Sequence, residues 1–139
     1  MPTSTAPTWT CTDVAALLRD RLERHGGCTL HGARARPVLH GLAVCAAPAT
    51  VWRFPVAGWD DAAVASWVHG WVPRLRAERL HLGAWCDGTD VVWLELVHVL
   101  PPHQRARAEA IGRRHAQQAI YDLTRDQLIP LLAVGVGLP

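Results

Sequence analysis

The most continuous apolar pattern of the chain lies between residues 80 and 123. Its first part, LHLGAWCDGTDVVWLELVHVL, contains two apolar runs that are separated by Asp87-Gly88-Thr89. A Gly after an Asp between two apolar runs is typical of an antiparallel hairpin. Residues 90–100 carry apolar side chains on both faces of a period-two pattern, which predicts a central strand covered on both sides. Glu95 is the exception, because it is a carboxylate in an otherwise apolar row.

The hairpin is followed by a pattern that predicts a helix and a returning strand. Pro101-Pro102 ends the strand, because proline cannot donate a hydrogen bond to a neighbouring strand. Residues 103–116 are rich in Ala, Arg, Gln and Glu and predict a helix with a small buried face. Residues 118–123 return as a short strand. The stretch 90–123 is therefore a strand–helix–strand unit, whose crossover is expected to be right-handed if its strands run parallel in one sheet.

The first half of the chain predicts two further helices and three strands. Thr12 or Asp13 is expected to cap a helix that ends at Gly26-Gly27, and Asp60 a second helix, which Pro73 should kink or end near Val72. The strands are expected at residues 28–30, 38–46 and 50–56, the last two as neighbours joined by a turn.

Together these elements predict an α+β fold, with a mainly antiparallel sheet of about five strands and three helices. The length of 139 residues indicates one domain, residues 11–139, after a flexible N-terminal tail, residues 1–10. Residues 128–139 are almost entirely apolar. Three interpretations of this segment stay open: an added edge strand, a flap over the sheet, or a contact between the subunits of a homodimer.

The second half of the chain resembles a group of small uncharacterised proteins of actinobacteria and of their phages and mobile elements. The resemblance depends on LGAW-CDGTD-VVWLEL and on a helix that ends in RRHAQQAIYDL, with HGGCTLHG as an earlier matching stretch. Glu95 stands where this group is expected to have Asp, and Cys28 where it is expected to have an aromatic residue. The resemblance implies a genomic setting and no particular reaction.

Composition and charge narrow the classes of function. All 14 basic residues are Arg, but 12 acidic residues leave a net charge of only +2, which gives little electrostatic support for nucleic-acid binding. The four cysteines are widely spaced and form no zinc motif, so we predict neither a metal site nor a cofactor. The chain begins without the pattern of a signal peptide, and no apolar run reaches the length of a membrane span. We therefore expect a cytoplasmic protein that does not bind membranes.

The candidate catalytic residues are Glu95, His98 and Asp122. A carboxylate on a buried strand face often has a raised pKa and can act as a general acid or base. Glu95 and His98, however, point to opposite faces of one strand, which argues against a shared site. The favoured interpretation is that Glu95 forms a structural ion pair with Arg107 or Arg114 of the following helix.

The candidate binding residues are Arg107 and Arg114 on this helix, Gln118 before the returning strand, and Trp85 on the hairpin. No nucleotide loop or nucleophile motif accompanies them. The first hypothesis is therefore an interaction or regulatory module of a mobile element or phage, which binds a protein partner or a second copy of itself. A small hydrolase or transferase that uses Glu95 or Asp122 with a histidine is the alternative. Nucleic-acid binding through the Arg-rich helix has the least support.

Overall fold

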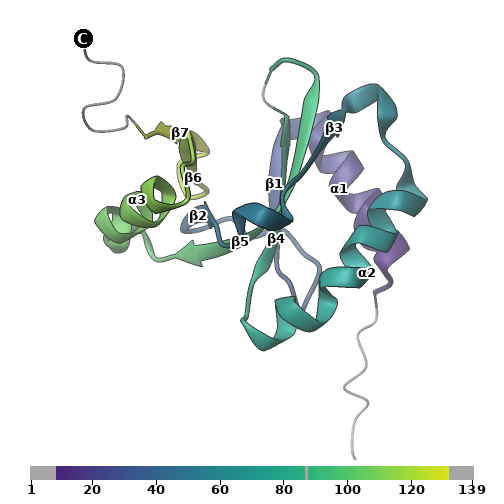
Figure 1. The fold of residues 1–139 in the computed structure, drawn as a ribbon, viewed down its shortest axis with the longest axis horizontal. Helices are drawn as coiled ribbons and strands as arrows, with labels where there is room; N and C mark the ends of the chain where they lie inside the picture. The colour runs from purple at the N-terminus through teal and green to yellow at the C-terminus, as the bar shows by residue number, and fades with distance from the viewer. Residues whose placement is uncertain (1–8, 87, 132–139) are drawn as a thin grey trace, which may run out of the picture.

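The computed structural model describes residues 9–86 and 88–131. Within these ranges the chain forms three α-helices, three short 3-10 helices and one seven-stranded sheet (Figure 1). The helices are α1 (Cys11–His25), α2 (Asp61–Ala77), α3 (Arg105–Arg114), η1 (Pro48–Thr50), η2 (Val56–Gly58) and η3 (Pro102–Gln104). The strands are β1 (Gly27–Leu30), β2 (Leu42–Cys45), β3 (Trp52–Pro55), β4 (His81–Cys86), β5 (Val91–Leu100), β6 (Ala119–Asp122) and β7 (Gln127–Pro130). The predicted α+β class is confirmed, with two more strands than the expected five.

Strand β5 is the centre of an antiparallel sheet with the order β1-β4-β5-β2-β6-β7. Strand β4 covers one edge of β5, in the register that pairs Gly83 with Glu95 and confirms the predicted hairpin. The other edge is shared, because β3 pairs with the first half of β5 and β2 with its second half. Strands β2 and β3 were expected to be neighbours. Instead they follow one another along the same edge of β5, separated by η1.

The strand–helix–strand unit lies within this one sheet. Strand β2 pairs antiparallel with both β5 and β6, so β5 and β6 run parallel with β2 between them. Helix α3 connects β5 to β6 and packs against β2 and β6. Strand β7 then adds to β6, so residues 128–130 of the predicted apolar segment form an added edge strand, which begins one residue earlier at Gln127. The remaining apolar residues, 132–139, lie outside the described part of the chain.

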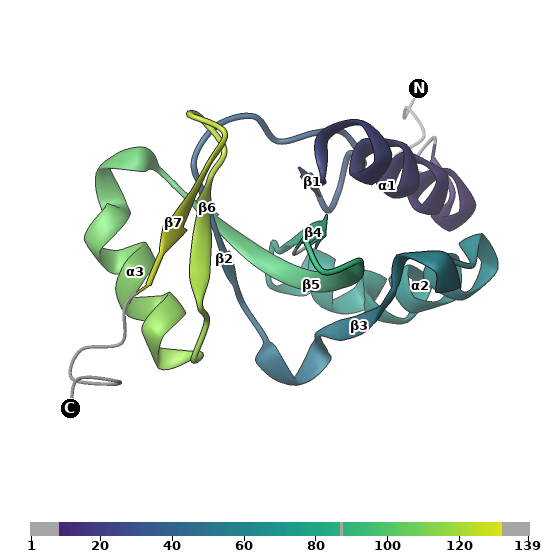
Figure 2. The same cartoon turned by 90° about the horizontal axis from the view of Figure 1, so that it is seen from above.

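All three α-helices lie on the outer face of a curled sheet (Figure 2). Helices α1 and α2 bury a large apolar cluster against β1, β4 and β5, and α3 buries a smaller one against β2, β6 and β7. The large cluster includes Leu18, Val68, Leu94 and Leu96, each fully buried. Burial of each such side chain contributes about 1.5–3 kcal/mol of stability. Within the described ranges, helices cover this outer face of β5 and not its inner face, in contrast to the predicted cover on both faces.

The ends of the first two α-helices follow local capping rules. Thr10 caps α1 in a capping box with Asp13, two residues before the predicted cap at Thr12. Gly26 ends α1 in the left-handed conformation (φ 75°), which glycine adopts without steric cost. Asp60 caps α2 as expected, but α2 continues through Pro73 to Ala77. The buried Leu75 continues the apolar stripe beyond the proline, and its packing offsets the lost backbone hydrogen bond.

Candidate functional site

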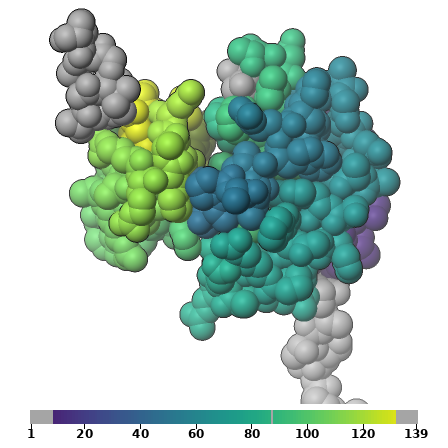
Figure 3. Space-filling view, in the orientation of Figure 1, coloured from purple at the N-terminus to yellow at the C-terminus, as the bar shows by residue number. Residues whose placement is uncertain are grey.

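The inner face of the curled sheet carries a groove that none of the described helices covers. Two adjoining cavities of about 350 and 540 Å³ form it, and Trp85, Glu95, Gln117, Ala119 and Leu128 line both of them. Figure 3 shows the hollow between the part built by α3, β6 and β7 and the part built by β3, β4 and β5. The groove therefore extends across the sheet, with β6 and β7 as one wall and β1 and β4 as the other.

Small residues on the inner face leave the space for this groove. Gly83 lies directly opposite Glu95, and a Cβ atom at Gly83 would lie 3.2 Å from Glu95 Cγ and 3.0 Å from Val97 Cγ1. Ala43 and Ala119 line the same cavity from β2 and β6. Larger side chains at these positions would fill the inner face as an ordinary core. The sequence signal for the groove was thus a set of Gly and Ala residues on the face of Glu95, which the apolar pattern alone did not reveal.

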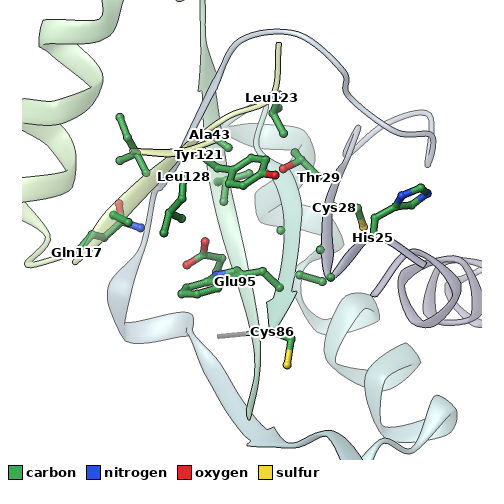
Figure 4. A pocket seen from close by; sticks show the side chains of 18 residues that line it. His25, Cys28, Thr29, Ala43, Cys86, Glu95, Gln117, Tyr121, Leu123 and Leu128 are labelled. Carbon is green, nitrogen blue, oxygen red and sulfur yellow. The ribbon is translucent and has the colours of Figure 1, made fainter. Parts of the chain in front are cut away.

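Glu95 lies at the floor of the groove, with only 8% of its surface exposed (Figure 4). Its carboxyl group is hydrogen-bonded to the side chains of Cys45 on β2 and Trp85 on β4. Burial raises the pKa of Glu95 to about 7, and these two hydrogen bonds oppose the increase. Within the described residues Glu95 forms no ion pair, and the expected pairing with Arg107 or Arg114 is not observed.

Aromatic side chains cover the floor of the groove beside Glu95. The rings of Trp85 and Trp93 are stacked with their centroids 5.3 Å apart and an angle of 14° between their planes. The guanidinium group of Arg53 lies over the Trp93 ring, 4.8 Å from its centroid. Such a contact between a cation and an indole face is favourable by about 0.5–1 kcal/mol when it is exposed. The stacked rings thus form a flat apolar surface next to a buried carboxyl group.

The segment between α3 and β6 fixes the wall of the groove near Cys45. His115 Nδ1 lies 2.7 Å from the backbone oxygen of Cys45, and the backbone N–H of Cys45 donates to Gln117 Oε1 over 3.0 Å.

On β6, the hydroxyl of Tyr121 donates a hydrogen bond to Asp126. Burial first, and then the Asp126 carboxylate, raise the pKa of Tyr121 to about 12. Tyr121 therefore faces the groove as a neutral phenol.

The three candidate catalytic residues are not brought together. His98 lies on the outer face of β5, opposite to that of Glu95, as strand alternation predicts. Asp122 is buried at the end of β6, pairs in register with Leu42, and accepts a hydrogen bond from the backbone N–H of Arg125 over 3.1 Å. Asp122 thus stabilises the turn that leads into β7. Of the three, Glu95 alone lines the groove.

The candidate binding residues fall into two groups. Trp85 and Gln118 line the groove, whereas Arg107 and Arg114 are exposed on α3. Arg107 donates a hydrogen bond to Gln104 over 3.4 Å. Elsewhere on α3, Glu109 forms ion pairs with two other arginines, which reduces the positive field of this helix.

Cys28 and Cys45 lack the lowered pKa that is typical of a nucleophilic thiol. Burial raises the pKa of both Cys28 and Cys45 to about 12, so these thiols are protonated near neutral pH. The rings of His31 and His81 lie 4.8 Å apart, and burial lowers the pKa of both. No group of three or more potential metal ligands gathers in the described residues.

None of the described helices combines the length and apolar character needed to span a bilayer. Comparison of the chain with known protein families, with curated proteins and with solved structures finds no match.

Proposed function

We propose that this chain is an interaction module that binds an extended segment of a protein partner in the groove on the inner face of its sheet. The observation that carries the proposal is the groove itself, an aromatic-floored hollow on a sheet whose other face is covered by helices. An interior sheet face of this size is normally packed by a second layer. Here Gly and Ala residues keep the space open, as a binding surface requires.

The shape of the groove favours an extended segment over a compact small molecule. Its cavities lie side by side from Cys28 at one end to Pro48 and His115 at the other. Each cavity falls within the range of about 300–1,000 Å³ that is typical of ligand sites. An extended chain places alternate side chains into successive pockets, which suits two joined hollows. The resemblance to actinobacterial and phage proteins agrees with an accessory role in the cytoplasm.

A display library of random peptides, selected against the full chain, tests this proposal. Leu128 is exposed over 54% of its surface and lines both cavities, so Leu128→Gln removes an apolar contact in the groove without opening the core. Leu39 is exposed over 62% and lines neither cavity, so Leu39→Gln is the matched control. We expect selected peptides to bind the wild type and Leu39→Gln equally and Leu128→Gln at least about fivefold more weakly. Failure to select any peptide, or equal binding to all three chains, would overturn the proposal.

A small hydrolase or transferase is the second candidate, because Glu95 combines a pKa of about 7 with a position in a cavity. A general acid or base works best when its pKa is close to the working pH. His115 lines one of the two cavities with Glu95 and is the histidine that would accompany it. If this candidate is correct, Glu95→Gln should abolish turnover of a substrate found by screening model esters and amides. Turnover that persists in this variant would contradict it.

A further inference from the structure

Glu95 is the single carboxylate among the described residues that line the groove. The groups that donate hydrogen bonds to it, the Cys45 thiol and the Trp85 indole, are both neutral. A buried carboxylate without a cation is unfavourable, because its hydration is lost and no opposite charge replaces it. A ligand that brings a positive charge to this point would restore the missing partner.

The surroundings of Glu95 suit a cation on an apolar stem. Gly83 and Ala119 leave room above the carboxyl group, and the ring of Trp85 lies beside it. Arg53 shows that a guanidinium group is accommodated on the neighbouring Trp93 face. A carboxylate with adjacent aromatic faces is the chemical combination that recognises ammonium and guanidinium groups.

We propose that the partner segment carries a Lys or Arg side chain whose aliphatic stem lies along the groove and whose charged end pairs with Glu95. This inference rests on the proposed function and names the chemistry of the segment that the groove selects. The stem would contact Trp85 and Leu128, and the charged end would reach the carboxyl group between β4 and β5. A long basic side chain can bury its methylene groups in this way while its charge finds a partner.

The pairing makes binding depend on pH. A cation pairs with the ionised form of Glu95, so affinity should increase as the pH rises through about 7. The other titratable or charged groups that line the groove are Arg53 on β3, His25 at the end of α1, His115 after α3, Tyr121 on β6 and the thiols of Cys28, Cys45 and Cys86.

Small probes test the cation site without any peptide. n-Butylguanidinium and n-butylammonium are titrated into the nitrogen-15-labelled full chain, with n-butanol as the neutral probe of similar shape. The indole N–H signal of Trp85 reports binding, because this group is hydrogen-bonded to Glu95. We expect both cations to shift this signal, and n-butanol to leave it nearly unchanged. Glu95→Gln should weaken cation binding at least about tenfold, whereas Glu78→Gln, which changes an exposed carboxylate at the C-terminal end of α2, should not.

The outcomes separate this inference from the proposed function. Equal shifts with n-butanol, or cation binding that survives Glu95→Gln, would overturn the cation site even if peptides bind in the groove. Peptides that bind but tolerate norleucine in place of every Lys or Arg would overturn it as well. Cation binding together with a failed peptide selection would uphold the site at Glu95 and overturn the proposed function.

Discussion

Replacement of Glu95 by Gln should remove a large pH-dependent term from the free energy of unfolding. Burial raises the pKa of Glu95 from 4.5 to about 7 in the folded chain. The folded state therefore holds its proton more tightly than the unfolded state, and this term favours folding at low pH. The stabilisation from protonated Glu95 is fully present below pH 4.5, the pKa of this group in the unfolded chain. It is lost as the pH rises through about 7, the pKa in the folded chain. Ionisation of the folded chain above this pH therefore destabilises it.

The magnitude follows from the size of the pKa difference. One pKa unit corresponds to about 1.4 kcal/mol, so the increase from 4.5 to about 7 corresponds to roughly 3 kcal/mol. The free energy of unfolding of a small domain is typically about 5–15 kcal/mol, so this value is a large part of it. Gln has nearly the same shape and does not titrate. The stability of Glu95→Gln relative to the wild type should thus increase by about 3 kcal/mol between about pH 4.5 and about pH 8.5.

Urea unfolding followed by tryptophan fluorescence measures this difference at the two pH values. Other groups also titrate: burial lowers the pKa of His31, His81 and His98, which favours folding at higher pH and opposes the effect of Glu95. Subtraction of the wild-type curve from that of the variant cancels these shared terms. A difference that stays constant within about 0.5 kcal/mol across this range would refute the reasoning and show that Glu95 ionises as an exposed carboxyl group does.

Three substitutions and one labelling experiment test the packing and the local structure. Gly112→Ala should destabilise the chain by about 1–3 kcal/mol in thermal or urea unfolding, because the new Cβ would lie 2.4 Å from a buried leucine methyl group. Gly70→Ala, whose Cβ meets nothing within 4 Å in α2, should instead stabilise it by about 0.5–1 kcal/mol, and equal effects would contradict the packing of α3. Thr10→Ala should cost about 1 kcal/mol by removing the cap of α1, and an unchanged midpoint would argue against the capping box. Iodoacetamide at about pH 8 should leave Cys28 and Cys45 unmodified in the native chain and label them in guanidinium, as peptide mass spectrometry can show, and rapid native labelling would contradict their raised pKa values.

The sequence predicts the elements of this fold better than their arrangement. The hairpin of β4 and β5 follows from two apolar runs on either side of a turn signal, and both are local in the sequence. The division of one β5 edge between β3 and β2 depends on long-range pairing, which no local pattern reports. Similarly, Pro73 reads as the end of a helix, but burial of Leu75 against the sheet extends α2 beyond it.

The candidate site could be predicted only in part, for a related reason. Glu95 was apparent because it interrupts an apolar strand, and Trp85 because it lies on the predicted hairpin. The partners of Glu95 were missed, because Cys45 approaches it from β2, a strand whose position was not predicted. The open inner face was missed as well, since Gly83 and Ala119 are as common in packed sheets as in grooves. Only the curl of the sheet, set by tertiary contacts, turns these small residues into a cavity.

The division of the apolar core into two clusters has a consequence for how the chain opens. Among the described residues, the cluster of β2, β6, β7, α3 and the end of β5 holds seven buried residues and the cluster of α1, α2, β1, β4 and β5 holds thirteen, so less described apolar surface holds the first unit closed. Cooperative units with less buried surface open at lower free energy, and their amide protons exchange sooner. Strands β6 and β7 form one wall of the groove and belong to the weaker unit. Local unfolding of that unit would therefore widen the groove while the larger cluster stays intact, so a bound segment should slow amide exchange in β6 and β7 more than in β4.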